Sequence, residues 1–154
     1  MKIRLLTVGP IENPNLRAIG ELYVQRIRHY LPIHLENIKQ EKIKSLSPGE
    51  ILGREATALR KKYQNGERRY ILDASGTQYT SEEFAGLFQN LANQGMKQVT
   101  FVIGGPIGLA ADIKKRDQRL SLGKMTLPHE LAAVLLLEQI YRSQTIIRGE
   151  KYHK

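Results

Sequence analysis

Strand-length apolar runs alternate with helical apolar patterns along the whole 154-residue chain. Residues 2–8, 33–38, 69–73, 99–103 and 119–122 have the length and composition of strands, and apolar residues recur between them at helical spacing. Strands that alternate with helices build parallel sheets, so the pattern predicts an α/β fold with a mostly parallel sheet flanked by helices. Connections are short, and residues 1–154 are expected to form a single domain.

The helices are expected over residues 16–30, 47–63, 80–95, 110–116 and 128–142. Ser47 and Glu50 have the spacing of a capping box, and Thr80 is expected to cap the third helix. Residues 74–78 are polar and contain a glycine, which predicts a turn. The apolar side chains expected to face the core in the first and last helices include Ile19, Leu22, Leu131, Val134, Leu135 and Ile140.

The charge balance is the most unusual part of the composition. With 24 Lys and Arg against 15 Asp and Glu the net charge is +9, which favours a polyanionic partner, although a solvated basic surface would look the same. There is no cysteine, and the four histidines have no suitable spacing, so no metal site is expected. We expect a cytoplasmic protein with no membrane partner, because the longest apolar run, residues 131–137, is too short to span a bilayer and no signal sequence precedes residue 2.

Three loops follow apolar strands, after Leu72, Ile103 and Leu122, where parallel sheets bind their ligands. The second loop has glycines at positions 104, 105 and 108 but lacks the lysine of a P-loop, which disfavours a nucleoside triphosphate. An ordinary tight turn would use similar glycines. The third loop, residues 122–127, combines backbone groups with apolar side chains and suits an adenine or a neutral nucleoside.

The last helix and the chain end carry a second set of candidate residues. Glu138, Tyr141 and Arg142 fall on one helical face, where a simple Glu–Arg ion pair is the alternative interpretation. Residues 152–154, Tyr-His-Lys, could stack on a base, handle a proton and contact a phosphate, or could form a disordered basic tail. His129 is interpreted as a capping or packing histidine.

Four segments together resemble the bacterial large-subunit ribosomal RNA pseudouridine N3-methyltransferases of the SPOUT class, the RlmH family. The segments are residues 101–109 (FVIGGPIGL), 121–129 (SLGKMTLPH), 138–142 (EQIYR) and 152–154 (YHK). The resemblance implies a C-terminal trefoil knot, a homodimer, and methylation of N3 of a pseudouridine in 23S rRNA within the assembled ribosome. It also implies that S-adenosyl-L-methionine is bound by Leu72, Gly104, Gly105, Gly108, Leu122, Gly123, Lys124, Met125, Thr126 and Leu127.

The resemblance further implies roles for the C-terminal residues. His153 would accept or relay the N3 proton, with solvent as the alternative acceptor, and Tyr152 would stack on the base or hydrogen-bond to it. Arg142 and Lys154 would hold RNA phosphate or polarise a base carbonyl, and Glu138 would orient Arg142.

Lys151 is the third residue expected to contact RNA, although relatives usually have proline there. Relatives commonly have arginine at the positions of Lys154 and Ala133, and lysine at the position of Thr77. These differences affect individual RNA contacts more than the cofactor site. Two other classes of function remain compatible with the residues alone. One is a non-catalytic ribosome-binding protein, and the other is a nucleotide-dependent enzyme on a Rossmann-like sheet.

Overall fold

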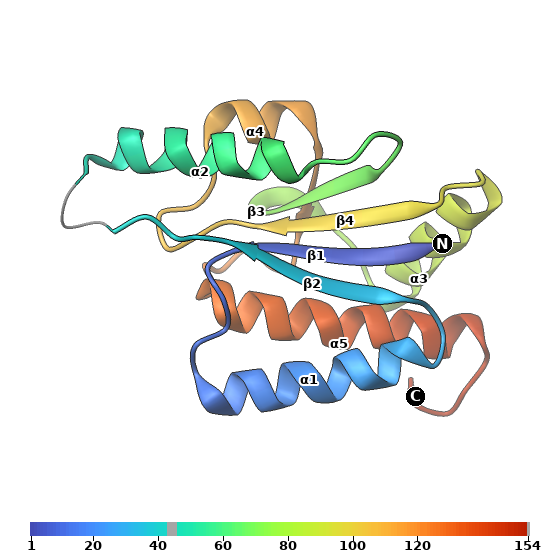
Figure 1. Cartoon of the computed structure of the whole chain (residues 1–154). Helices are drawn as coiled ribbons and strands as arrows, with labels where there is room; N and C mark the ends of the chain where they lie inside the picture. Colours follow the sequence, from blue (N-terminus) through green and yellow to red (C-terminus); the bar gives the residue numbers. More distant parts are fainter. Residues whose placement is uncertain (43–45, 154) are drawn as a thin grey trace.

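The computed structural model describes residues 1–42 and 46–153, and in these residues five strands alternate with five helices (Figure 1). The elements are β1 (Lys2–Val8), α1 (Pro14–Arg28), β2 (Ile33–Ile38), α2 (Pro48–Lys62), β3 (Arg68–Gln78), α3 (Ser81–Asn93), β4 (Gln98–Ile103), α4 (Ala111–Arg116), β5 (Gln118–Ser121) and α5 (His129–Ile147). No described helix is both long and apolar enough to cross a membrane.

All strand pairs are parallel, in the order β2-β1-β4-β3-β5, which confirms the predicted sheet. Helices α2 and α4 cover one face, and α1, α3 and α5 cover the other (Figure 1). The apolar side chains of β4 alternate between the two cores, since Phe101 packs with α3 and α5 while Val102 packs with α2 and α4. Every residue of this central strand is buried, as expected for a strand covered on both faces. The knot stays a prediction.

Both predicted helix caps are present. The Ser47 side chain accepts from the Glu50 amide at 3.3 Å, and the Glu50 carboxylate accepts from the Ser47 amide at 2.9 Å. Thr80 and Glu83 form the same reciprocal pair at the start of α3. Each capping box satisfies two amides that a helix start leaves without a partner, so these local sequences fix where α2 and α3 begin.

The prediction of a turn over residues 74–78 was wrong. Strand β3 continues to Gln78 through an irregular segment, and both Leu72 and Thr77 register with Leu120 of β5. The backbone of Gly76 lies so close to β5 that an added Cβ would be 2.7 Å from backbone atoms of Arg119 and Leu120. Residues 73–76 are therefore extra residues that form a bulge, which ends where Gly76 lies against β5. The strand pairs with β5 again from Thr77.

The last helix was predicted too short, and three apolar side chains were misplaced. Helix α5 continues to Ile147. Ser143 and Thr145 can be buried within it because their hydroxyls donate hydrogen bonds to carbonyls of the helix. By contrast, three side chains expected in the core are exposed, namely Ile19 at 43%, Leu22 at 44% and Leu135 at 39%. Helical spacing predicted an apolar stripe on α1 and α5 that is wider than the part of each helix buried within one chain.

A buried charge network lies near the amino ends of β1 and β4. The side chain of Glu67 is fully buried and accepts hydrogen bonds from Thr100 at 2.6 Å and Gln98 at 2.8 Å. Arg4 lies 3.4 Å from Glu67 and 2.7 Å from Glu36. Burial alone would raise the pKa of Glu67, but the hydrogen bonds, led by that from Thr100, lower it below the usual value.

Candidate functional site

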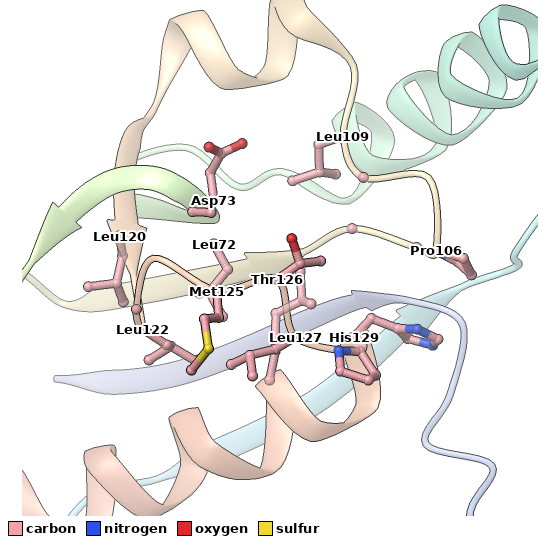
Figure 2. A pocket seen from close by; sticks show the side chains of 18 of the residues that line it. Leu72, Asp73, Pro106, Leu109, Leu120, Leu122, Met125, Thr126, Leu127 and His129 are labelled. Carbon is pink, nitrogen blue, oxygen red and sulfur yellow. The ribbon is translucent and has the colours of Figure 1, made fainter.

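A pocket of about 710 Å³ opens at the carboxyl end of the sheet, between the loops after β4 and β5 and the start of α5 (Figure 2). Nine of the ten residues predicted to bind a cofactor line it, namely Leu72, Gly104, Gly105, Gly108, Leu122, Gly123, Met125, Thr126 and Leu127. The tenth, Lys124, is exposed and does not line the pocket. The structure therefore brings together segments that lie more than 50 residues apart in the chain.

The loop after β4 is folded back on itself, and glycine is required for that shape. A Cβ on Gly104 would lie 2.6 Å from the carbonyl oxygen of Gly108, closer than real contacts allow. Gly108 has a φ of +85° and donates from its amide to the Gly105 carbonyl at 2.9 Å. The pocket wall is therefore bare backbone, which a ligand can approach closely.

The loop after β5 supplies the apolar side of the pocket. Ser121 fixes the start of this loop with two hydrogen bonds. Its hydroxyl donates to the Gly123 carbonyl at 2.8 Å and accepts from the Gly123 amide at 3.2 Å. Leu122, Met125 and Leu127 carry apolar side chains around the cavity (Figure 2). Met125 is 81% exposed, which is unusual for a large apolar side chain and places it at the mouth. Apolar side chains combined with backbone groups suit a heterocyclic ring.

The sequence interpretation missed three polar residues of the pocket, Asp73, Lys114 and His129. Lys114 lies 2.6 Å from Asp73, whose other oxygen accepts from the amide and the hydroxyl of Ser75. Burial by itself would raise the pKa of Asp73, but the hydrogen bonds from Lys114 and Ser75 lower it to about 2. The position of Asp73 directly after the apolar part of β3 could have predicted that it lines the pocket. Only the fold shows that Lys114 is its partner.

The C-terminal candidates form a separate cluster on α5. Arg142 donates to one oxygen of Glu138 from Nε at 3.0 Å and from Nη2 at 2.6 Å, so the simple ion pair does exist. The Tyr152 hydroxyl donates to the same oxygen at 3.0 Å, and the Arg142 guanidinium lies 4.8 Å from the Tyr152 ring centre. Burial, together with Tyr23 and Glu138, raises the pKa of Tyr152, so its hydroxyl stays protonated at neutral pH.

Both ring nitrogens of His153 have partners. Nδ1 lies 3.4 Å from Arg142 Nη1, and Nε2 lies 2.7 Å from a carboxylate oxygen of Glu82 in α3. Because a guanidinium can only donate, Nδ1 accepts from Arg142, and Nε2 carries the hydrogen directed at Glu82. The Tyr152 ring also packs edge-on against Tyr141 with ring centres 4.6 Å apart. The tail up to His153 is therefore packed onto its own chain.

Within one chain this cluster and the pocket lie apart. His129 starts α5 at the pocket, and Arg142 lies about 20 Å further along that helix at roughly 1.5 Å per residue. Lys151 is exposed beyond the end of α5, and Lys154 lies outside the described residues. No group of three or more His, Cys, Asp or Glu suitable for a metal occurs in residues 1–42 and 46–153.

The sequence is similar to known proteins over its whole length. The family described as "Predicted SPOUT methyltransferase" matches residues 1–153. A protein from Coprothermobacter proteolyticus named "Ribosomal RNA large subunit methyltransferase H" is 39% identical, with 100% of both chains covered. Proteins of the same name from Christiangramia forsetii and Rubrobacter xylanophilus are 35% and 43% identical, with 99% and 86% of each chain covered.

Proposed function

The chain belongs to the SPOUT methyltransferase family, and we propose that it transfers a methyl group from S-adenosyl-L-methionine to N3 of a pseudouridine in 23S rRNA. The assembled ribosome is the proposed substrate. The observation that carries the proposal is the convergence of the glycine loop and residues 122–127 on one pocket. The names of the relatives support rRNA as the substrate, and the four resembling segments support pseudouridine N3.

The pocket fits S-adenosyl-L-methionine in size and chemistry. Its volume of about 710 Å³ lies within the range of pockets that bury small ligands. The bare backbone at Gly104 and the side chains of Leu72, Leu122 and Leu127 offer hydrogen-bonding groups beside apolar surface. When bound, the cofactor supplies an electrophilic methyl group. Calorimetry with S-adenosyl-L-methionine, ATP and NAD distinguishes this proposal from a Rossmann-like enzyme and from a non-catalytic binder.

The active enzyme is proposed to be a homodimer in which the tail of one subunit completes the pocket of the other. The separation of about 20 Å along α5 supports this arrangement, because one chain does not bring His153 to its own pocket. The exposed Ile19, Leu22 and Leu135 also support it, since apolar surface of this kind is commonly buried between subunits.

In the proposed mechanism the chain's own residues position the base and remove its proton. Tyr152 stacks on the base or hydrogen-bonds to it, while Arg142, oriented by Glu138, and Lys154 hold RNA phosphate or polarise a base carbonyl. His153 accepts or relays the N3 proton. To do so it must give up its contact with Arg142, because Nδ1 accepts from Arg142 in the free chain while Nε2 carries the hydrogen directed at Glu82.

The direct test is incubation with labelled S-adenosyl-L-methionine and either ribosomes or free rRNA, followed by mass mapping of the modified nucleotide. Label at N3 of a pseudouridine in ribosomes is the expected result. Label elsewhere, or none, would refute the proposed reaction. His153→Ala should reduce single-turnover methylation by about two to four orders of magnitude, and an unchanged rate would assign the proton to solvent.

Mixed dimers test the shared site. His153→Ala impairs the tail and Gly104→Ala impairs the pocket, so each variant alone should retain about 1% of wild-type activity or less. If tail and pocket come from different subunits, random mixing should restore about a quarter of wild-type activity, because each mixed dimer holds one intact site. A mixture as inactive as its components would show that no site combines the two subunits.

A further inference from the structure

The corner where α4 passes into β5 carries positive charge that its own acidic residues do not neutralise. Each of its carboxylates is held by a cation, in the pairs Asp73–Lys114, Asp117–Arg69 and Asp112–Arg60. Lys115, Arg116 and Arg119 are exposed, and within the described residues none of them forms an ion pair. Three uncompensated cations in a five-residue stretch attract a polyanion, because phosphates that contact them release condensed counterions.

Beside these cations lies a small polar hollow of about 310 Å³, the β5 hollow, lined by Ser75, Thr77, Tyr79, Gln118 and Arg119 among others. Tyr79 is 37% exposed although it is aromatic, and Arg119 is exposed as well. Tyrosine rings and guanidinium planes are the surfaces on which unpaired RNA bases stack. The hydroxyls and the amide around them supply hydrogen-bonding groups for base edges or ribose.

The β5 hollow and the cofactor pocket share a wall. Arg119 Nη1 donates to the Ser75 hydroxyl at 2.9 Å, and that hydroxyl donates to Asp73 at 2.5 Å. The other oxygen of Asp73 accepts from Lys114 at 2.6 Å, and both of these residues line the cofactor pocket. The bulged part of β3 therefore joins the two sites by one chain of hydrogen bonds, so a nucleotide in the hollow would neighbour the pocket.

We propose that this corner is an RNA-binding surface, where a nucleotide near the methylated one lies in the β5 hollow against Tyr79 and Arg119. The phosphates beside it contact Lys115 and Arg116. The proposal rests on the proposed function, because it takes rRNA as the partner. It adds a place on the chain where that substrate is held, separate from the C-terminal cluster on α5.

The charge part is tested with the double variant Lys115→Gln/Arg116→Gln. Its matched control is Lys2→Gln/Lys97→Gln, which removes the same charge from exposed lysines at the start of the β1–β4 pair, separated from β5 by β3. The corner variant should raise the KM for ribosomes about tenfold and reduce the salt dependence of binding by about one unit of log–log slope per cation. The control should leave both unchanged, and kcat should be unaffected in each.

The stacking part is tested at Tyr79. Tyr79→Phe keeps the ring and should bind ribosomes like wild type, whereas Tyr79→Leu should weaken binding at least about fivefold. Ultraviolet cross-linking of the wild-type complex, read by mass spectrometry, should join peptides containing residues 79 or 115–119 to RNA. Cofactor affinity measured by calorimetry should be the same in all variants, because none of the substituted residues lines the cofactor pocket.

Three results would overturn the proposal. If the corner and control variants weakened ribosome binding equally, the effect would come from the net charge of the protein and not from this surface. Loss of cofactor binding in the corner variants would show that the corner supports the pocket, not the RNA. Cross-links from the corner to ribosomal protein alone would assign it a different partner. Failure of wild-type protein to methylate rRNA would instead refute the proposed function, which keeps the two failures distinct.

Discussion

Gly104 is the position where the smallest change should have the largest effect on the pocket. In Gly104→Ala the new Cβ would lie 2.6 Å from the Gly108 carbonyl oxygen and 2.7 Å from Leu109 Cγ. To reach an ordinary contact of 3.4 Å the carbonyl must retreat by about 0.8 Å. Both partners belong to the folded-back loop, so the movement distorts the pocket wall itself. A misplacement of this size costs on the order of 100-fold in methyl transfer, and overpacking costs about 1–3 kcal/mol of stability.

Gly86→Ala is the matched control, because Gly86 lies within α3 and has no atom within 4 Å of its added Cβ. This variant should bind the cofactor normally and gain about 0.5–1 kcal/mol of stability, since alanine favours the helix. Calorimetric titration with S-adenosyl-L-methionine and urea unfolding measure both properties. Normal cofactor affinity and activity in Gly104→Ala would refute the argument that the loop needs a bare backbone at this position.

The remaining predictions concern charged groups. Arg142→Lys should reduce single-turnover methylation about tenfold or more with unchanged cofactor affinity, because lysine cannot hold Glu138 through two nitrogens and also lie against Tyr152; an unchanged rate would contradict this. Glu67→Gln should lower the free energy of unfolding at pH 7 by about 1–3 kcal/mol, because it weakens the bonds from Thr100 and leaves Arg4 less compensated. The pKa of Glu67 is lower in the folded protein than in the unfolded chain. The ionised carboxylate therefore adds to the free energy of unfolding above the unfolded pKa of about 4.3, and this stabilisation is lost as pH falls through the folded pKa. Urea unfolding from pH 7 to pH 3 should therefore show a weaker pH dependence in Glu67→Gln, and identical pH profiles would contradict the assignment.

The sequence predicted local structure well wherever the cause was local. The capping boxes at Ser47 and Thr80 and the apolar run of β4 depend on residues within a few positions of one another, and all three are present. It failed where a distant segment decides the conformation. Gly76 reads as a turn residue, yet the close approach of the β5 backbone turns the segment into an irregular strand.

The site divides along the same line. The glycine spacing at 104–108 and the apolar residues 122–127 were sufficient to predict which loops form the pocket, because backbone shape depends on the residue types within each loop. The Asp73–Lys114 pair was not predictable, since nothing local in the sequence marks two residues 41 positions apart as neighbours.

The sequence by itself determined the alternation of elements, the loops that meet at the carboxyl end of the sheet, and the family. Only the tertiary structure decided that the cluster of Glu138, Arg142 and Tyr152 lies along α5 away from the pocket of its own chain, and that Ile19 and Leu135 face outward. The physical reason is that periodicity tells which side chains are apolar, whereas which surfaces are covered depends on how the helices pack on the sheet.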